Sequence, residues 1–222
     1  MIDLHTHTIL SDGELLPSEL VRRAVVNGYK AIALADHVDA SNIDFVIPRI
    51  AHVAKQLNSA WDIVVIPAAE LTHIPIEHIK GLVKKARHLG ARLILVHGQT
   101  EAEPVLPGTN KEALLANIDI LAHPGMITEE EVKLAIKNNI YLEITTRNLH
   151  KETNGHLIKM TRNTEAKLVL DTDTHSPENL ITKEKACKFL SDLGLTREEQ
   201  EKVFLNSQEL VSCLGIKKEK LL

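Results

Sequence analysis

Aromatic residues are scarce in this chain. Its 222 residues include three phenylalanines, two tyrosines and one tryptophan, so the hydrophobic core must be mainly aliphatic. The net charge is −4, and the tail at residues 217–220 is locally basic. Because the chain has few rings for base stacking and no basic face for phosphates, the sequence argues against a dedicated nucleic-acid binder.

Long apolar runs and paired cysteines are also missing. No run approaches the roughly 18 residues of a membrane span, and no basic region followed by an apolar one marks a signal peptide at the N-terminus. Cys187 and Cys213 fit no zinc or redox spacing, and we expect them to be reduced, buried thiols. The sequence therefore predicts a cytoplasmic protein without membrane contact and leaves its oligomeric state open.

Apolar segments of strand length alternate with segments of helical spacing along the chain. The predicted strands are residues 2–4, 31–35, 63–66 continuing to Glu70, 92–96, 118–122, 141–144 and 167–170. The predicted helices are residues 15–27, 43–57, 76–89, 111–117, 128–138, 156–163, 183–193, 198–204 and 208–214, with an Asn154-Gly155 turn before the sixth. Seven βα units in series predict an α/β fold with one parallel sheet covered by helices, in a single domain of residues 1–222.

Polar residues recur just past the carboxyl ends of these predicted strands. Parallel α/β folds place their functional sites at this edge. Distant strands of an open sheet could not all direct residues to one place, whereas the strands of a closed barrel can. The pattern therefore favours a barrel of about seven strands with its functional site at one end.

The first predicted strand ends in His5 and His7, and Asp12 follows in a turn. Side chains at positions i and i+2 share one face of a strand, so both imidazoles leave it in one direction. Chance alone gives about 0.6 His-x-His pairs in a chain with 12 histidines, so this pair carries little weight by itself. Its weight comes from the later strand ends, where Asp173-Thr-His175 repeats the same spacing.

Nine strand-end residues form a candidate set of metal ligands. They are His5, His7, Asp12, His37, Glu70, His97, His123, Asp173 and His175. All offer nitrogen or oxygen and none offers a thiolate, which suits Zn²⁺, Mn²⁺ or Fe²⁺. Nine ligands exceed the needs of one tetrahedral zinc and fit two or three divalent ions, with Glu70 able to bridge.

Several short motifs follow one another in a fixed order over residues 2–175. They are Asp3-Leu-His-Thr-His-Thr, Ser11-Asp-Gly13, Asp36-His37, Ala69-Glu70, His97, His123-Pro-Gly125 and Asp173-Thr-His175. This ordered set resembles the motifs of the PHP (polymerase and histidinol phosphatase) superfamily. The resemblance implies a distorted, TIM-like barrel of seven strands with a trinuclear metal site that hydrolyses phosphoesters. It also implies one metal on His5, His7, Glu70 and Asp173, a second on Glu70, His97 and His123, and a third on Asp12, His37 and His175.

The expected reaction follows from such a centre. A hydroxide bridging two ions about 3.5–4 Å apart is nucleophilic at neutral pH and would attack phosphorus in line. Asp173, or the third metal together with His175, would assist the leaving alkoxide. Arg147, just past the sixth strand, is a candidate phosphate clamp, since its guanidinium matches phosphate oxygens in a fork; an ordinary surface role is the alternative. The expected substrate is a phosphomonoester, either a small phosphorylated metabolite or a nucleotide.

Three alternative functions stay open on the sequence alone. A nuclease or nucleotide phosphodiesterase would use the same metals. An amidohydrolase also begins with His-x-His, but it usually has a bridging lysine after strand four, whereas this chain has Glu70 after strand three. A non-catalytic barrel subunit would be expected to lose ligands, and this chain retains all nine.

Other polar residues near the strand ends receive ordinary roles. We expect His150 and His156 to be solvated and Asp171 to orient a ligand imidazole. We also expect the loop carboxylates Glu101 and Glu103 to be solvated, with contact to a substrate as the alternative. Asp12 stands where some members of the superfamily carry histidine, and Gly-Gln-Thr follows His97 in place of the proline that follows His123. These two departures concern the third metal and the loop after the fourth strand.

Overall fold

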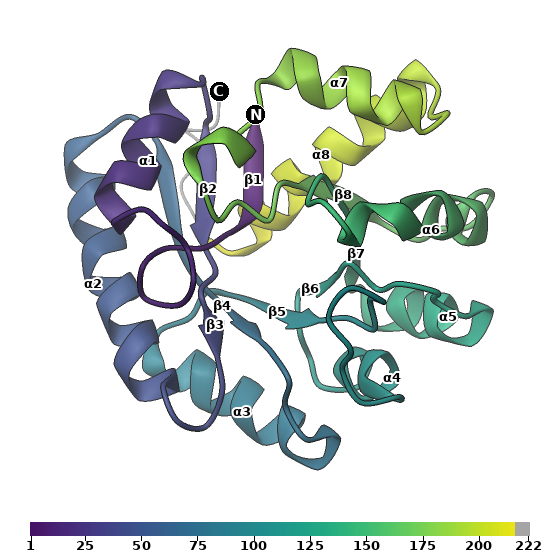
Figure 1. Cartoon of the computed structure of the whole chain (residues 1–222), viewed down its shortest axis with the longest axis horizontal. Coiled ribbons are helices and arrows are strands. Elements are labelled where there is room, and N and C mark those ends of the chain that lie inside the picture. The colour runs from purple at the N-terminus through teal and green to yellow at the C-terminus, as the bar shows by residue number, and fades with distance from the viewer. Residues whose placement is uncertain (216–222) are drawn as a thin grey trace.

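Eight parallel strands form one curved sheet around a common axis (Figure 1). The computed structural model describes residues 1–215, so the basic segment 217–220 lies outside the described residues. Strands pair in the order β1-β2-β4-β5-β6-β7-β8, and the short β3 pairs with β4. The strands are β1 (Ile2–Thr6), β2 (Ala31–Leu34), β3 (His37–Val38), β4 (Val64–Leu71), β5 (Leu93–His97), β6 (Ile120–Ala122), β7 (Tyr141–Thr145) and β8 (Leu168–Asp171). A single bridge between Thr6 and Thr174 brings the two ends together, so the sheet nearly closes into a barrel.

Helices connect the strands and surround the barrel in Figure 1. They are α1 (Pro17–Val26), α2 (Ile43–Ala60), α3 (Ile76–Leu89), α4 (Thr109–Leu114), α5 (Glu129–Asn138), α6 (Asn154–Thr161), α7 (Lys183–Asp192) and α8 (Arg197–Cys213), with 3-10 turns η1 (His150–Thr153) and η2 (Pro177–Asn179). The predicted α/β barrel is confirmed, and β3 is a short addition to its seven main strands. None of the helices in residues 1–215 is both long and apolar enough to cross a membrane.

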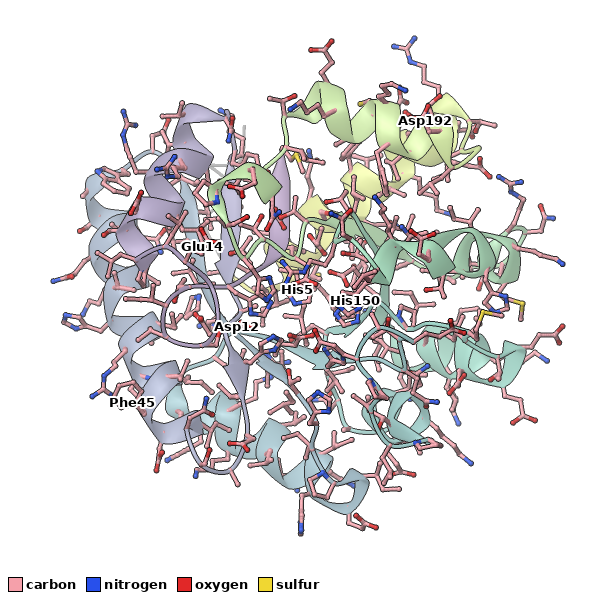
Figure 2. All side chains as sticks on the ribbon, viewed as in Figure 1. His5, Asp12, Glu14, Phe45, His150 and Asp192 are labelled. Atoms are coloured by element: carbon pink, nitrogen blue, oxygen red, sulfur yellow. The ribbon has the colours of Figure 1, made fainter. Side chains whose placement is uncertain are left out.

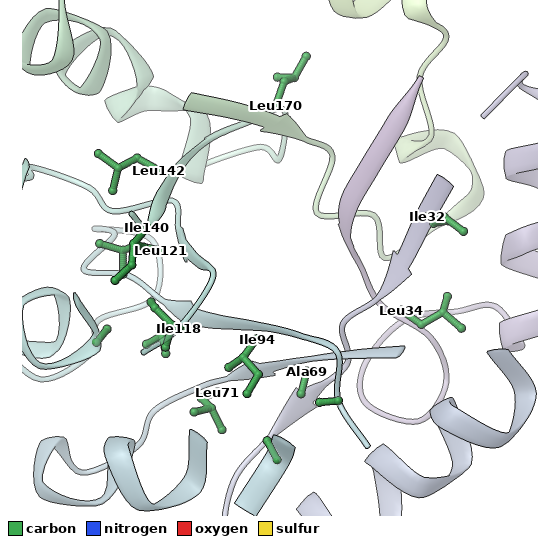
Figure 3. Packing of buried hydrophobic residues seen from close by; sticks show 14 of the residues in the cluster. Ile32, Leu34, Ala69, Leu71, Ile94, Ile118, Leu121, Ile140, Leu142 and Leu170 are labelled. Atoms are coloured by element: carbon green, nitrogen blue, oxygen red, sulfur yellow. The ribbon is translucent and has the colours of Figure 1, made fainter. Parts of the chain in front are cut away.

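Alternate residues along the strands belong to two different apolar clusters. On β2, Ile32 and Leu34 belong to the larger cluster, which includes the buried faces of the helices, whereas Ala31 and Ala33 belong to the smaller one. Figure 3 shows Ile32, Leu34 and other side chains of the larger cluster pointing away from the ring of strands. Since the side-chain period of a strand is two, every second residue faces inward.

This inward row changes from apolar to polar toward the carboxyl ends of the strands. On β4 the row of the smaller cluster runs through Val64, Ile66 and Ala68, and the next residue of the same parity is Glu70. On β5 the inward row runs through Leu93 and Leu95 and ends at His97, the last residue of the strand. The period of the strand therefore carries the predicted ligands into one end of the barrel, above an apolar floor.

The join between β1 and β8 depends on side chains rather than on a regular strand ladder. The Leu4 N–H donates to the Asp171 carboxylate at 2.6 Å, and the Thr172 hydroxyl donates to Asp3 at 2.7 Å. Helix α8 packs against both strands at this join. Burial raises the pKa of Asp171 well above its usual value, and the neighbouring Asp3 carboxylate adds to the rise. Two buried acids therefore fix the first strand against the last one.

The C-terminal helices differ from the prediction. Residues 198–204 and 208–214 were expected to form two helices, but they lie in the single helix α8. Asn206 and Ser207 interrupt the apolar pattern without ending the helix, because both side chains find partners. The Asn206 amide donates to the Leu168 carbonyl at 2.7 Å, and the Ser207 hydroxyl donates to the Val203 carbonyl at 3.5 Å.

Two further local predictions were wrong. Asn154 begins α6 instead of forming a turn before it, since its side-chain amide bonds both the N–H and the carbonyl of Thr145 on β7, at 3.2 and 2.8 Å. The two cysteines are free, as expected, but they are not buried. Cys187 is half-buried and Cys213 is exposed, because they lie near the outer faces of α7 and α8.

Candidate metal centre

The nine predicted ligands converge at the carboxyl end of the barrel. Figure 2 shows His5 and Asp12 near the middle of the ring of strands, with Phe45 and Asp192 at the periphery. The ligand atoms form four groups whose members lie within 4.8 Å of one another. These are His7, Asp12, His37 and His175; His5, His123 and Asp173; His5, His7 and Glu70; and Glu70, His97 and His123. Each predicted ligand belongs to at least one group.

Glu70 lies at the middle of this centre and is fully buried. Its Oε2 is 3.3 Å from Nε2 of His5 and 2.7 Å from Nδ1 of His37. Its Oε1 is 3.4 Å from Nδ1 of His97 and 3.5 Å from Nε2 of His123. Because the two oxygens face different histidines, this carboxylate can bridge two cations.

Asp173 and Asp12 are two further carboxylates that face imidazoles of the centre. Asp173 Oδ1 lies 3.1 Å from Nε2 of His7 and 3.3 Å from Nδ1 of His175. Asp12 Oδ2 lies 3.2 Å from Nε2 of His175 and 3.6 Å from Nε2 of His37. The Asp12 side chain is 54% exposed and that of Asp173 only 4%, so the group around Asp12 is the one open to solvent.

Unpartnered buried atoms test whether these residues fit metal ions. In residues 1–215, the buried side-chain atoms without a hydrogen-bond partner are His5 Nε2, both ring nitrogens of His7 and of His97, both oxygens of Glu70, His123 Nδ1, Asp173 Oδ1, Tyr141 Oη and Asp171 Oδ2. All but the last two belong to predicted ligands. Each such atom costs about 1–3 kcal/mol when it stays unpaired. Divalent cations coordinated by these nitrogens and oxygens would satisfy the set, so the donor atoms fit.

The carboxylates of the centre are ionised at neutral pH. Burial would raise the pKa of the Glu70 carboxyl, but the positive charges of His5 and His37 outweigh burial and hold that pKa well below its usual value. The same opposition, with His5 and a hydrogen bond from His7 against burial, lowers the pKa of Asp173. Both acids are therefore in the form that binds a cation.

The imidazoles differ from one another in their affinity for protons. Burial lowers the pKa of His7 to about 3, so His7 is neutral, which is the ligating form. Burial acts on His5 in the same direction, but the carboxylates of Glu143 and Glu70 overcome it and raise the pKa of His5 well above its usual value. A cation that binds at His5 must displace a proton.

Asp36 fixes the loop that carries Asp12. Its Oδ1 accepts the Thr8 N–H at 2.8 Å and the Ser11 hydroxyl at 2.7 Å. Gly13 leaves no room for a side chain, since a Cβ there would lie 2.5 Å from the carbonyl oxygen of His7. The loop is therefore wound tightly enough to return Asp12 toward the end of β1.

The loops after β5 and β6 approach each other through two glycines. A Cβ on Gly98 would lie 2.3 Å from the Ala122 carbonyl oxygen, and one on Gly125 would lie 1.9 Å from that of Gln99. Gly125 also has φ +64°, which side chains rarely adopt. This close approach brings the ring centroids of His97 and His123 to 4.4 Å.

The sequence-based interpretation missed two residues beside the ligands. Glu143, in the middle of β7, lies 2.7 Å from Nδ1 of His5, whereas the sequence-based expectation was that Asp171 would contact a ligand imidazole. Asp171 instead accepts the backbone N–H of Leu4. A signal for Glu143 existed, because a lone acid inside the apolar segment Tyr141–Thr145 of a sheet buried on both faces needs a partner.

His150 was expected to be solvated, and that prediction was wrong. It is buried, and its ring stacks on that of His123 with centroids 4.4 Å apart. Its Nδ1 lies 3.0 Å from the Thr100 hydroxyl. Figure 2 shows His150 close to His5 at the centre of the ring. Glu103 is half-exposed but faces the centre, with its carboxylate 3.7 Å from His150 and 3.9 Å from His97. The polar segment around His150 gave no sequence signal for this burial.

Arg147 lines a pocket beside the metal centre. The pocket has a volume of about 280 Å³ and is lined by Ala102, Glu103, Arg147, Asn148, Leu149, His150 and Asn179. Arg147 Nη1 lies 3.5 Å from Asn179 Oδ1, and the same oxygen accepts the His175 N–H at 3.0 Å. The pocket therefore adjoins two of the candidate ligands. Its lining residue Asn179 contacts His175, and its lining residue His150 stacks on His123.

This protein is a nearly closed α/β barrel, and its imidazoles and carboxylates gather at the carboxyl end of the strands. These two features place it in the class of metal-binding α/β barrels. Residues 3–163 match the family model of the PHP domain, and the chain belongs to this family. Membership supports a metal-dependent phosphoesterase, and hence a hydrolase, in general terms. Asp173 and His175 lie beyond the matched residues.

The chain is similar to known proteins over nearly its whole length. It is 46% identical to an uncharacterized protein of Methanocaldococcus jannaschii over 206 residues, which cover 92% of this chain and 94% of that protein. A solved chain from archaeal ribonuclease P with mature tRNA has a TM-score of 0.75 at 15% identity, covering 96% of this chain and 91% of that one. A candidate histidinol phosphatase from Listeria monocytogenes has a TM-score of 0.62 at 12% identity, covering 84% and 99%. At these identities the two structures are evidence about the fold alone.

Proposed function

We propose that this protein is a metal-dependent phosphatase that releases phosphate from a phosphomonoester, either a small metabolite or a nucleotide. The observation that carries the proposal is the convergence of nine nitrogen and oxygen ligands around the buried carboxylate of Glu70. The buried polar side chains in residues 1–215 include no lysine, and Glu70 occupies the bridging position, which disfavours the amidohydrolase alternative. Retention of the full ligand set disfavours a non-catalytic subunit.

Two or three divalent ions would occupy the ligand groups. Glu70, His97 and His123 would hold one ion, His5, His7, Glu70 and Asp173 a second, and Asp12, His37 and His175 a third, all drawn from the groups that converge in the structure. When bound, Zn²⁺, Mn²⁺ or Fe²⁺ would supply an acidified water as the nucleophile and positive charge for the phosphoryl oxygens.

Protein side chains would bind the phosphate and assist its release. Arg147 is partly buried at the pocket wall, where its guanidinium can bind two phosphoryl oxygens in a fork. Asp173 and His175 lie near Arg147. Asn179 Oδ1 accepts the His175 N–H and lies 3.5 Å from Nη1 of Arg147, and Nδ1 of His175 lies 3.3 Å from Asp173. We assign to these two residues the assistance of the leaving oxygen, by Asp173 itself or by His175 together with the third ion.

The pocket beside the centre supports a small substrate. Its volume of about 280 Å³ lies near the lower limit of the usual range for small-molecule sites, about 300–1,000 Å³. Arg147 provides its positive charge, Glu103 its negative charge, and Asn148 and Asn179 its amides. A polar metabolite or one nucleoside suits such a lining better than a long nucleic acid does, in a chain whose net charge is −4.

The test is a substrate screen of the full chain with Mn²⁺, Zn²⁺ and Fe²⁺ added separately. The panel contains phosphorylated metabolites, nucleotides and bis(p-nitrophenyl) phosphate as a diester. We expect phosphate release from monoesters, lost in Glu70→Gln and retained in His88→Asn, a control on the exposed face of α3. Turnover of the diester alone would establish the phosphodiesterase alternative, and no turnover with any ion would refute the proposal.

A further inference from the structure

Glu143 is a fully buried carboxylate that contacts two candidate ligands at once. Its Oε1 lies 2.7 Å from Nδ1 of His5, and its Oε2 accepts the backbone N–H of His123 at 2.8 Å. It lies on β7, which pairs with β6 on one side and β8 on the other. The carboxylate therefore joins a ligand from the first strand to one that follows β6.

The contact with His5 determines which ring nitrogen is free for a metal. A carboxylate accepts hydrogen bonds, so Glu143 holds a proton on Nδ1 of His5, and the nitrogen that gives up its proton to a cation is Nε2. This Nε2 lies 3.3 Å from Glu70, is buried and has no hydrogen-bond partner. Carboxylates that accept the second N–H of a metal-binding histidine hold the ring and raise its basicity.

The contact with His123 acts on the backbone. His123 has φ +25°, outside the regions that non-glycine residues prefer. Its N–H points into the interior and donates to Glu143, so the carboxylate stabilises this conformation. The turn directs Nε2 of His123 to 3.5 Å from Glu70.

We propose that Glu143 is a positioning residue of the metal centre, which fixes the ring of His5 and the backbone of His123 so that both face the same ions. This inference rests on the proposed function only in requiring that ions bind. Glu143 is not itself one of the candidate ligands. Both of its oxygens are needed for its role, because one contacts His5 and the other contacts the His123 backbone.

Glu143→Gln separates this role from simple packing. The amide keeps the shape of the side chain but offers one acceptor and one donor, so it cannot accept from His5 and His123 together. We expect the dissociation constants for Zn²⁺ and Mn²⁺ to rise about 10–100-fold, as for other residues that orient metal ligands. Glu143→Asp keeps the charge but is too short to reach both partners, and we expect it to lie between wild type and Glu143→Gln.

The measurement is competition for Zn²⁺ and Mn²⁺ against a chromophoric chelator. Asp119→Asn is the matched control, because Asp119 is a largely buried acid that also holds two partners, the Arg87 guanidinium and the Ile94 N–H, both at 2.6 Å. We expect wild-type affinity in this control. We also expect excess metal to restore phosphatase activity in Glu143→Gln, which a purely structural defect would not allow.

The outcomes separate this inference from the proposed function. If wild type binds ions and Glu143→Gln binds them equally well, Glu143 is not a positioning residue and the inference is wrong. If Asp119→Asn weakens binding as much, the effect is general destabilisation and the inference is again wrong. If wild type binds no ion, both proposals fail. Should Glu143→Gln not fold, wild-type affinity in Glu143→Asp would still overturn the inference.

Discussion

Removal of divalent ions should lower the melting temperature of this protein by a calculable amount. The buried, unpartnered atoms of the centre exist as a cluster only in the folded chain, so ions bind the folded state preferentially. One site with free ion at a thousandfold excess over its dissociation constant stabilises the fold by about 4.1 kcal/mol. For chains of about 150–250 residues each kcal/mol moves the melting temperature by about 2–4 °C, so one site is worth about 8–16 °C.

The assay is thermal unfolding in chelator and with Mn²⁺, Zn²⁺ or Fe²⁺, followed by fluorescence of an added dye. Wild type should show the full increase with at least one ion. Glu70→Gln should lose most of the increase, because Glu70 belongs to two of the ligand groups. His88→Asn should keep it, since His88 is exposed on α3. Equal melting temperatures with chelator and with all three ions, or an unchanged increase in Glu70→Gln, would refute the reasoning.

Three further changes test single features. Gly125→Ala should destabilise the fold by more than about 1–2 kcal/mol in urea unfolding, because the new Cβ would lie 1.9 Å from the Gln99 carbonyl oxygen and the backbone φ is left-handed. Gly155→Ala is the control and should be neutral or stabilising, because a Cβ there would have no neighbour within 4 Å. Arg147→Ala should raise KM for the phosphomonoester about tenfold or more in steady-state assays, through loss of a charged hydrogen bond of about 1.5–3 kcal/mol; an unchanged KM would remove its role as a clamp. Thr128→Ala should cost about 1 kcal/mol in urea unfolding, since Thr128 caps α5 in a capping box, and no loss would contradict that cap.

The sequence predicted the order of the strands because each strand is a short apolar run that ends in polar residues. The period of two placed His5 and His7 together, and the same period along β4 carried Glu70 inward. Local helix signals were equally informative, since Thr128 and Glu131, three positions apart in the sequence, form a capping box at the start of the predicted helix α5. These features depend on neighbours along the chain, which the sequence shows directly.

The missed features depend on partners that are distant in the sequence. His150 is buried because its ring meets His123 and its Nδ1 meets Thr100, and nothing near it in the chain indicates either contact. Asn206 stays inside a helix because it bonds Leu168 of β8. Polar residues that look like surface or helix-ending positions in the sequence become interior ones once a distant partner satisfies them.

The join between β1 and β8 has a consequence for the order in which the protein is built. Leu4 and Asp171, which meet there, stand 167 positions apart, and the ligands His5 and Asp173 lie beside them. On the ribosome the first strand emerges long before its neighbour is synthesised. Ions held between His5 and Asp173 would fasten the beginning of the chain to a segment made near the end of translation, so a nascent chain cannot complete its metal centre early.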